Sequence, residues 1–200
     1  RRTLLKNTQQ RGHQRGLPVM TVHQINRPIE FQAIQRDIHR HLAKQGKKVG
    51  MVTVHLYRPF STKYLMKVMP KSVKRIAVLD RTKEPGANGE PLYLDICETF
   101  YGKENAPLIV GGRYGLSSKD TTPVQIMTVY ENLEQKEPKN RFTLGIIDDV
   151  TYTSLPMKEE ISLEHKGTFE GKFYGLGSDG TVGANKNSIK IIGDSTDKYA

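Results

Sequence analysis

Residues 74–80, Lys-Arg-Ile-Ala-Val-Leu-Asp, decide the fold class of this chain. The centre of the stretch is a short apolar run, and the run ends in an aspartate. A strand with apolar residues at consecutive positions is buried on both faces, which is typical of a parallel sheet covered by helices on each side. The carboxyl ends of such strands are where α/β sheets hold their functional residues. The stretch therefore predicts both a fold class and a place to look for a site.

Strands and helices alternate on both sides of this stretch. The predicted helices carry apolar residues three or four positions apart, and the predicted strands are short apolar runs. We predict strands over residues 49–56, 74–80, 107–111 and 141–147, and helices over residues 29–43, 63–68, 90–100 and 122–133. This alternation indicates βαβ units, and therefore an α/β fold with a mostly parallel sheet and flanking helices.

The loops that follow the predicted strands are the first candidates for function. They contain Arg58, residues 80–89, residues 111–120 and the pair Asp148-Asp149. The loop 80–89 is either a binding loop or a solvated loop with local ion pairs. The paired aspartates could bind a metal ion, but a turn or a helix cap uses the same residues, and we favour the turn. No pair of nucleophile and base is visible, so we assign no catalytic residue.

A glycine-rich segment lies further along, where residues 171–186 read Gly-Lys-Phe-Tyr-Gly-Leu-Gly-Ser-Asp-Gly-Thr-Val-Gly-Ala-Asn-Lys. We predict a short strand at 172–174, then a loop, then a helix over 182–192. A glycine loop before a helix can bind an anion such as phosphate, because unpaired N–H groups and the helix dipole point at the ligand. The candidate binding residues lie in the loop or the first helical turns: Gly175, Gly177, Ser178, Asp179, Gly180, Thr181, Val182, Gly183, Asn185 and Lys186.

The same loop allows other interpretations. Residues 175–180 match the G-x-G-x-x-G pattern of dinucleotide-binding units, in which Asp194 would end a second strand at 188–192. The apolar spacing over 188–192 favours a helix instead. The loop is not a Walker A motif, because no Ser or Thr directly follows Lys186. A tight turn that packs a helix onto a strand is the purely structural alternative.

Positive charge is concentrated at the start of the chain. Residues 1–48 hold 11 Lys/Arg and 2 acids, whereas residues 49–200 hold 20 Lys/Arg and 19 acids. A basic arm can bind nucleic acid, so a non-enzymatic nucleic-acid-binding module is a second hypothesis. Residues 1–29 show no period and contain glycine and proline breakers. We interpret residues 1–35 as an irregular basic arm that is not native to the fold, residues 36–160 as one domain and residues 161–200 as the incomplete start of another.

Composition excludes several classes of protein. The chain has no apolar run near 18 residues, and no apolar segment follows its basic start, so we expect neither a membrane span nor a secretory signal. Its one cysteine, Cys97, excludes an internal disulfide or a cysteine-built metal cluster within these 200 residues. These features predict a cytoplasmic protein without a membrane partner.

Five strings of this chain occur in a recognisable order: VHLYRPF at 54–60, KRIAVLDRTKEPG at 74–86, GGRYGLSSK at 111–119, RFTLGIIDDVT at 141–151 and GLGSDGTVGANK at 175–186. Together they resemble pyruvate:ferredoxin (flavodoxin) oxidoreductases, which are large multidomain enzymes that act on 2-oxoacids. The strings extend across about 150 residues, which makes the match far more specific than any single motif. Residues 1–35 depart from the family, which has an apolar strand there, so the first strand of the domain is expected to be missing.

The resemblance implies which domains of the family the chain represents and which ligand its glycine loop contacts. Residues up to about 160 would form the family's second domain, similar to the transketolase C-terminal domain, and the chain would enter the third, gamma-like domain at about residue 167. The glycine loop of that domain is associated with coenzyme A, so the implied guest is CoA phosphate. The whole enzyme would use thiamine diphosphate, Mg²⁺ and [4Fe-4S] clusters held by its other domains, pass electrons to ferredoxin or flavodoxin, and act as a homodimer.

Overall fold

A computed structural model describes residues 15–24, 29–157, 161, 167, 169, 171 and 173–198. The chain divides into two compact units, residues 1–163 (unit 1) and 164–200 (unit 2), and each is described by itself. The elements of unit 1 are β1 (Arg15–Gln24), α1 (Ile29–Lys44), β2 (Lys47–Val54), α2 (Thr62–Val68), β3 (Arg75–Asp80), α3 (Pro91–Phe100), β4 (Leu108–Arg113), the 3₁₀ turn η1 (Leu116–Ser118), α4 (Pro123–Glu134) and β5 (Phe142–Thr143). Unit 2 contains α5 (Thr181–Ser195).

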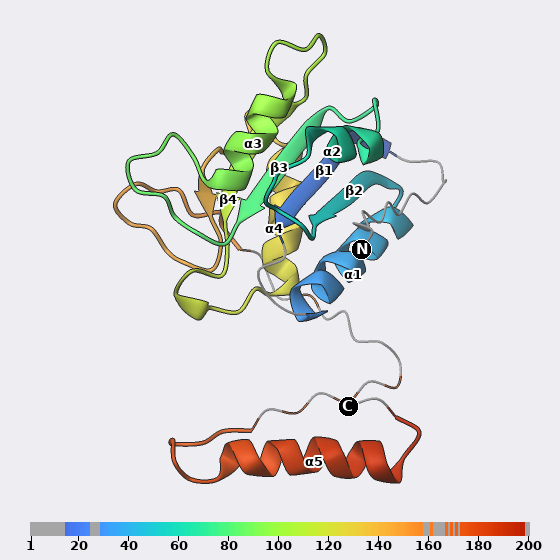
Figure 1. Cartoon of the computed structure of the whole chain (residues 1–200), viewed down its shortest axis with the longest axis vertical. Coiled ribbons are helices and arrows are strands. Elements are labelled where there is room, and N and C mark those ends of the chain that lie inside the picture. The colour runs from blue at the N-terminus through green and yellow to red at the C-terminus, as the bar shows by residue number, and fades with distance from the viewer. Residues whose placement is uncertain are drawn as a thin grey trace. The chain divides into compact units, whose positions relative to one another are not determined.

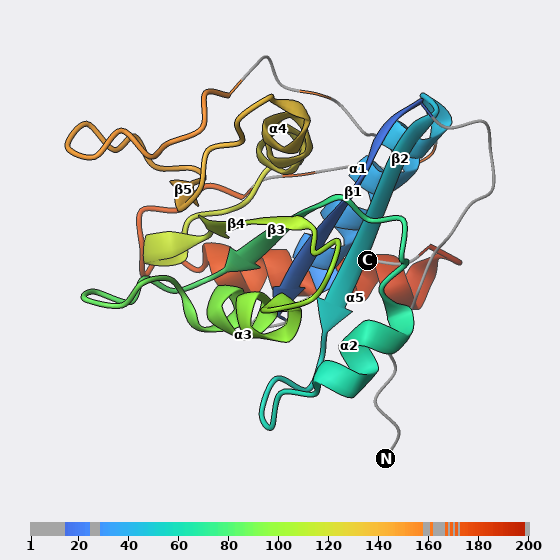
Figure 2. The same cartoon turned by 90° about the horizontal axis from the view of Figure 1, so that it is seen from above.

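Unit 1 is built on a five-stranded sheet in the order β2-β1-β3-β4-β5, with every pair parallel. Helices cover both faces, with α1 and α4 on one and α2 and α3 on the other (Figures 1 and 2). The α/β fold with a parallel sheet and flanking helices is thus confirmed. Among the described residues, no helix is long and apolar enough to cross a membrane.

Two hydrophobic clusters hold the layers together, one on each face of the sheet. Neighbouring residues of a strand alternate between them, so Ala77 and Leu79 of β3 pack with α1 and α4 while Ile76 and Val78 pack with α2 and α3. All four side chains are buried. Burial on both faces explains why residues 74–80 read as a continuous apolar run.

The first strand of the sheet lies inside the segment that we expected to be irregular. β1 pairs with β2 on one side and with β3 on the other, and its Val19, Met20 and Val22 are buried. The expectation of an irregular arm is therefore wrong for Arg15–Gln24, and so is the expectation that the domain lacks its first strand. Residues 1–14 and 25–28 of the expected arm lie outside the described residues.

The predicted helices of unit 1 are confirmed, whereas one strand is much shorter than predicted. The strand expected over 141–147 is reduced to Phe142–Thr143. Arg141, directly before this strand, has a φ of 55°, and Gly145, shortly after it, has a φ of 72°. A positive φ is incompatible with extended strand backbone, so the strand begins after Arg141 and ends before Gly145. The chain leaves the sheet as a loop soon after it joins β4.

Candidate functional site

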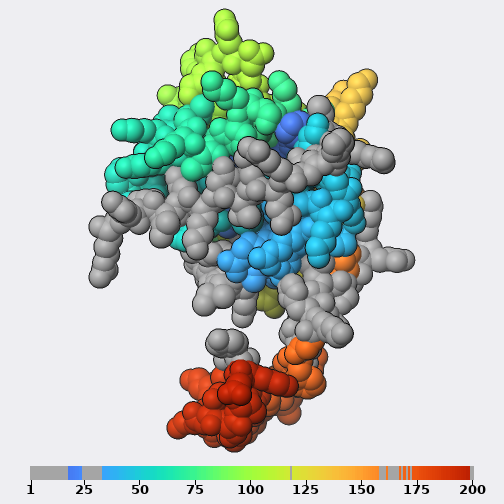
Figure 3. Space-filling model, turned by 90° about the vertical axis from the view of Figure 1, so that its right-hand side faces the viewer, coloured from blue at the N-terminus to red at the C-terminus, as the bar shows by residue number. Residues whose placement is uncertain are grey.

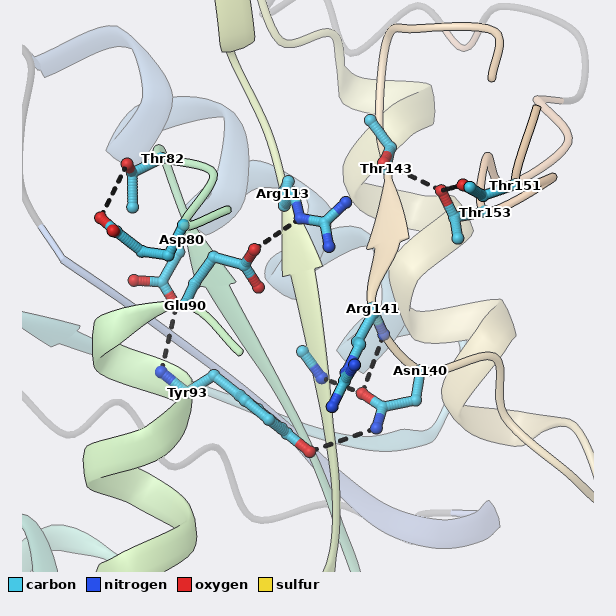
Figure 4. Close-up of polar contacts among 12 residues, drawn as sticks. Asp80, Thr82, Glu90, Tyr93, Arg113, Asn140, Arg141, Thr143, Thr151 and Thr153 are labelled. Carbon is cyan, nitrogen blue, oxygen red and sulfur yellow. Dashed lines mark hydrogen bonds and ion pairs between the residues drawn. The ribbon is translucent and has the colours of Figure 1, made fainter. Parts of the chain in front are cut away.

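Asp80 at the end of β3 binds the N-terminus of α3, as Figure 4 shows. Its two carboxylate oxygens accept hydrogen bonds from the backbone N–H groups of Leu92 and Tyr93, each at 3.0 Å. The residue before them, Pro91, has no N–H, so Asp80 satisfies the first two donors of the helix. A negative charge at a helix N-terminus is favourable because the helix dipole is positive there. The predicted functional loop therefore begins with a residue that also holds α3 in place.

The environment of Asp80 shifts its ionisation. Burial raises the pKa of the Asp80 carboxyl to about 6, and the two N–H donors oppose this rise while the nearby Glu90 adds to it. Desolvation disfavours the charged form of a carboxyl group, and a second carboxylate disfavours it further. Among the carboxyl groups of the described residues at this edge of the sheet, Asp80 is the one whose pKa is strongly raised.

This shift predicts how the stability of unit 1 depends on pH. In the unfolded chain the pKa of Asp80 returns to about 3.9, so the folded chain binds the proton more tightly. Between about pH 4 and pH 6 the free energy of unfolding should therefore fall as pH rises, by at most about 1.4 kcal/mol per pH unit. Asp80→Asn should remove this contribution, as measured by urea unfolding at several pH values. Parallel pH profiles for the two proteins would show that Asp80 titrates at its ordinary pKa.

Glu90 and Arg113 form a buried ion pair beside Asp80 (Figure 4). Arg113 Nε donates to Glu90 Oε1 at 2.6 Å, and the side chains are 15% and 2% exposed. The other carboxylate oxygen, Glu90 Oε2, is buried and accepts no hydrogen bond from any described residue. A charge-assisted pair in a dry environment is strong, but both charges need each other to remain inside the protein.

Asn140 connects three elements next to this pair. Its Oδ1 accepts from the N–H groups of Gly111 in β4 and Arg141, at 2.7 and 2.8 Å, and its Nδ2 donates to the Tyr93 hydroxyl of α3 at 3.2 Å. Figure 4 shows this amide between β4 and the segment that leads into β5. The amide thus satisfies two backbone N–H groups and links α3 to β4.

Asp148 forms a turn with the residues that follow it. The Asp148 carboxylate accepts from the N–H groups of Val150, Thr151 and Thr153 and from both threonine hydroxyls. These bonds, with the Thr151 hydroxyl as the largest contribution, hold the pKa of Asp148 well below its usual range. The described residues contain no group of three or more metal-ligating side chains. The turn that we favoured for this loop is confirmed.

Arg58 and Arg81, from the other predicted loops, make separate contacts. The guanidinium of Arg58 stacks on the Tyr57 ring at 3.8 Å and forms an exposed ion pair with Asp95 at 2.7 Å. Arg81 Nε donates to the carbonyl of Gly115 at 3.2 Å, which ties the loop after β3 to the loop after β4. Of the predicted loops, the structure therefore joins 80–89 and 111–120.

The glycine loop of unit 2 precedes a helix but does not follow a strand. Phe173 and Tyr174 have no strand partner, and Lys172 lies outside the described residues, so the predicted strand is wrong where it can be assessed. α5 runs through residues 188–192 and includes Asp194. The dinucleotide-binding interpretation needs a strand at that place and is thereby excluded, whereas the predicted helix is confirmed.

Asp179 occupies the start of α5. Its carboxylate accepts from the N–H of Leu176 at 2.6 Å, and from the N–H and hydroxyl of Thr181 at 3.0 and 2.6 Å. The Thr181 hydroxyl makes the largest contribution in lowering the pKa of Asp179 to about 2. The protein's own carboxylate thus stands where an anion was expected. The first α-helical bond runs from Ala184 N to Gly180 O, so the N–H groups of Val182 and Gly183 precede it.

At three positions of the loop, the backbone conformation or the lack of space favours glycine. Gly177 and Gly180 have φ values of 88° and 83°, which favour glycine. A Cβ on Gly175 would lie 2.6 Å from Thr181 Oγ1. Of the other candidates, Thr181 and Asn185 are half-buried, and the rest are exposed: Ser178, Asp179, Val182, Gly183 and Lys186.

Unit 1 is an α/β domain whose polar residues gather at the carboxyl edge of a parallel sheet, as in enzymes of this class. Residues 31–126 match a family described as "Pyruvate:ferredoxin oxidoreductase core domain II". The chain is 60% identical over 160 residues to the pyruvate:ferredoxin oxidoreductase of Moorella thermoacetica and 58% identical over 161 residues to the pyruvate-flavodoxin oxidoreductase of Enterobacter agglomerans. It belongs to the pyruvate:ferredoxin (flavodoxin) oxidoreductase family, and the predicted resemblance is confirmed.

The alignments to these two relatives cover 80% of this chain but only 14% of each relative. A further relative, the mitochondrial NADP⁺-dependent pyruvate dehydrogenase of Euglena gracilis, is 54% identical over 160 residues, which is 9% of its length. The family match at 31–126 includes Asp80, Glu90 and Arg113. It does not reach the glycine loop of unit 2.

Sequence reasoning missed the Glu90–Arg113 pair and Asn140. Glu90 directly before Pro91 could have been suspected, because an acid next to a helix start is a recognisable pattern. Its partner Arg113 lies at the end of β4, 23 positions along the chain, and no sequence pattern joins the two. The nucleic-acid hypothesis rests on the basic arm, and nothing in the described residues or the relatives supports it.

Proposed function

We propose that this chain forms part of an enzyme that oxidatively decarboxylates pyruvate to acetyl-CoA. In that reaction pyruvate loses CO₂, two electrons leave for ferredoxin or flavodoxin, and the acetyl group is transferred to the sulfur of CoA. The observation that carries the proposal is the identity of 52–60% to proteins named pyruvate:ferredoxin or pyruvate-flavodoxin oxidoreductase, across about 80% of the chain. We place the enzyme in the cytoplasm, as a homodimer.

Unit 1 would contribute a scaffold domain to this enzyme. The charged groups at the carboxyl edge of its sheet are used internally, since Asp80 binds the start of α3 and Arg113 pairs with Glu90. A [4Fe-4S] cluster takes four thiolates, and the single cysteine of this chain does not fit one. Thiamine diphosphate, Mg²⁺ and the clusters would therefore be held by other domains, and no step of the reaction is assigned to unit 1.

Unit 2 would contact CoA through its glycine loop. The N–H groups of Val182 and Gly183 lie in the first turn of α5, before the bond from Ala184 N to Gly180 O, and Lys186 adds a positive charge within the first two turns of the helix. Because Asp179 already accepts hydrogen bonds from Leu176 and Thr181, a phosphate would bind beside it. The N–H groups of Val182 and Gly183, together with Lys186 and the Asn185 amide, would supply the contacts.

Lys186→Ala is expected to weaken CoA binding in the full-length enzyme. Loss of one cation near a phosphate should raise the KM for CoA roughly tenfold, because a charge-assisted hydrogen bond contributes about 1.5 kcal/mol. Decarboxylation of pyruvate in the absence of CoA should stay unchanged. Both quantities are measured by steady-state kinetics and by release of ¹⁴CO₂.

Lys198→Ala is the matched control, since Lys198 is an exposed lysine beyond the other end of α5. It should leave the KM for CoA unaltered. An unchanged KM in Lys186→Ala would remove the CoA assignment from this loop. Loss of decarboxylation in both variants would instead indicate damage to the enzyme as a whole.

A further inference from the structure

The loop that follows β5, residues 144–155, carries three large apolar side chains on its outside. Ile147, Val150 and Tyr152 are 90%, 81% and 74% exposed. Among the other large apolar side chains described in unit 1, only Tyr101 has a comparable exposure, 85%. Single exposed apolar residues are common on protein surfaces, whereas three of them within six positions indicate a contact surface.

Hydrogen bonds within the loop fix its shape. The Asp148 carboxylate accepts from three backbone N–H groups of the residues that follow it, at 2.9 to 3.3 Å. The Ser154 hydroxyl closes the loop, because it accepts from the N–H of Asp148 at 2.7 Å and donates to the carbonyl of Ile146 at 2.6 Å. The polar groups of the loop thus satisfy one another, and its apolar side chains remain on the outside.

Further bonds tie the loop to the rest of unit 1. Lys139 Nζ donates to the carbonyls of Tyr152 and Ser154 at 2.9 and 3.1 Å. Leu155, at the end of the loop, is buried, and its N–H donates to the carbonyl of Thr143 in β5 at 3.2 Å. Tyr152 has a φ of 54°, and a non-glycine residue keeps such a conformation only where the surrounding structure imposes it. The loop therefore presents its apolar side chains in one fixed arrangement.

The loop lies at the β5 end of the sheet, where Figures 1 and 2 show it, in orange, projecting from the body of unit 1. Figure 3 shows the opposite side, which carries α1 and α2, in blue and teal. The exposed side chains of α2 and the turn after it include Lys63, Lys67 and Lys71. The two sides of unit 1 thus differ in chemistry, since lysines favour contact with water and large apolar groups do not.

The composition of the loop favours a permanent contact over a transient one. The charged residues between positions 144 and 155 are Asp148 and Asp149, and Asp148 is used within the loop. Transient encounters between proteins are steered by charge. The buried centres of permanent contacts are apolar, poor in charge and rich in aromatic residues such as Tyr152.

The length of the relatives indicates what covers the loop. The alignments to the two relatives cover only 14% of each, so in an enzyme of that length most of the polypeptide lies outside this chain. A domain on the same polypeptide is tethered to unit 1 and meets it at a high effective concentration. A few apolar side chains in a fixed arrangement are then enough to hold the two domains together.

We propose that the loop of residues 144–155 is the contact through which unit 1 packs against an apolar surface on another domain of the same polypeptide. The inference rests on the proposed function, in which this chain is one part of a longer enzyme. Ile147, Val150 and Tyr152 are buried together in that contact. Asp148 holds them in position and takes no part in the contact itself.

The test uses the full-length enzyme with Tyr152 replaced by p-benzoylphenylalanine, a photoreactive residue that is also aromatic. Irradiation should link this residue to a segment of the same polypeptide that lies outside these 200 residues, and mass spectrometry of the peptides identifies the segment. On a denaturing gel the product should keep the mass of one polypeptide. The same photoreactive residue at Lys67 should give about tenfold less product, because charged positions are depleted from permanent contacts.

Two pairs of substitutions make the result specific. Ile147→Ser with Val150→Ser should lower the yield from position 152 about tenfold or more, because each buried side chain of this size contributes enough free energy for such a change. The turn itself should persist, since Val150 binds Asp148 through its backbone N–H. Ile147→Val with Val150→Ile keeps the apolar surface and should leave the yield within about twofold of its original value.

Several outcomes would overturn the contact. They are the absence of a linked product, a yield no higher than at Lys67, and a yield that the serine pair leaves unchanged. A product with the mass of two polypeptides would place the contact between two copies of the enzyme and would overturn it as well. Pyruvate-dependent reduction of methyl viologen, measured on the same samples, tests the proposed function separately. Its absence in the wild type would overturn that function, whereas normal reduction without a linked product overturns the contact alone.

Discussion

Gly112→Ala should lower the free energy of unfolding of unit 1 by about 3 kcal/mol, at the upper end of the usual cost of overpacking a core. A Cβ on Gly112 would lie 2.2 Å from two atoms of the Phe142 ring. Phe142 is fully buried, and its strand β5 pairs with β4 at this residue. The ring cannot move aside without opening the last pair of strands in the sheet. Urea unfolding followed by far-UV circular dichroism measures the change.

Phe142→Ala provides the control for this prediction. Alone it should cost about 3–5 kcal/mol, because it removes a large buried ring and leaves a cavity. In the double variant the added methyl group of Gly112→Ala has room, so the pair should be no less stable than Phe142→Ala alone. If the two effects simply add, the Phe142 ring is not what excludes a side chain at Gly112.

Arg113→Met should destabilise unit 1 by about 3 kcal/mol or more, since it leaves Glu90 as a buried charge without a partner. Only 2% of the Glu90 side chain is exposed, and Arg113 Nε is its hydrogen-bond donor among the described residues. Urea unfolding of the variant and of the wild type measures the change.

The double variant Glu90→Gln with Arg113→Met removes both charges. It should recover most of the lost stability, because the cost of the single substitution comes from an unpaired charge and not from lost packing. A double variant as unstable as Arg113→Met would show that the arginine stabilises unit 1 through its packing.

The layers of unit 1 could be predicted because most of its helices and strands have a recognisable pattern in their own sequence. The buried run at 74–80, the apolar spacing of α4 and the capping serine before α2 are patterns that need no knowledge of the partner element. β1 was missed because its apolar core, Val19 to Val22, is short and lies among Arg, His and Gln. The polar composition of residues 1–29 outweighed this four-residue run between Pro18 and Pro28 in our prediction.

In the candidate site, too, we predicted the residues that follow from local sequence and missed those that depend on tertiary contacts. Asp80 and the loop after β4 were predicted because they follow buried strands, whereas the Glu90–Arg113 pair joins residues 23 positions apart and depends on the register of β3 and β4. In unit 2 the glycines correctly predicted a turn before a helix. They did not predict that Asp179 would occupy the helix N-terminus, since an Asp among glycines fits either a solvent-facing position or a cap.

The α/β class, the alternation of elements and the family follow from the amino-acid sequence, because an apolar strand pattern and long shared strings are properties of the chain alone. The tertiary structure adds that β1 lies inside the sheet, between β2 and β3, and that Glu90 pairs with Arg113. Each of these contacts joins residues that are remote in sequence. The contacts depend on packing and on strand register, which no local sequence pattern encodes.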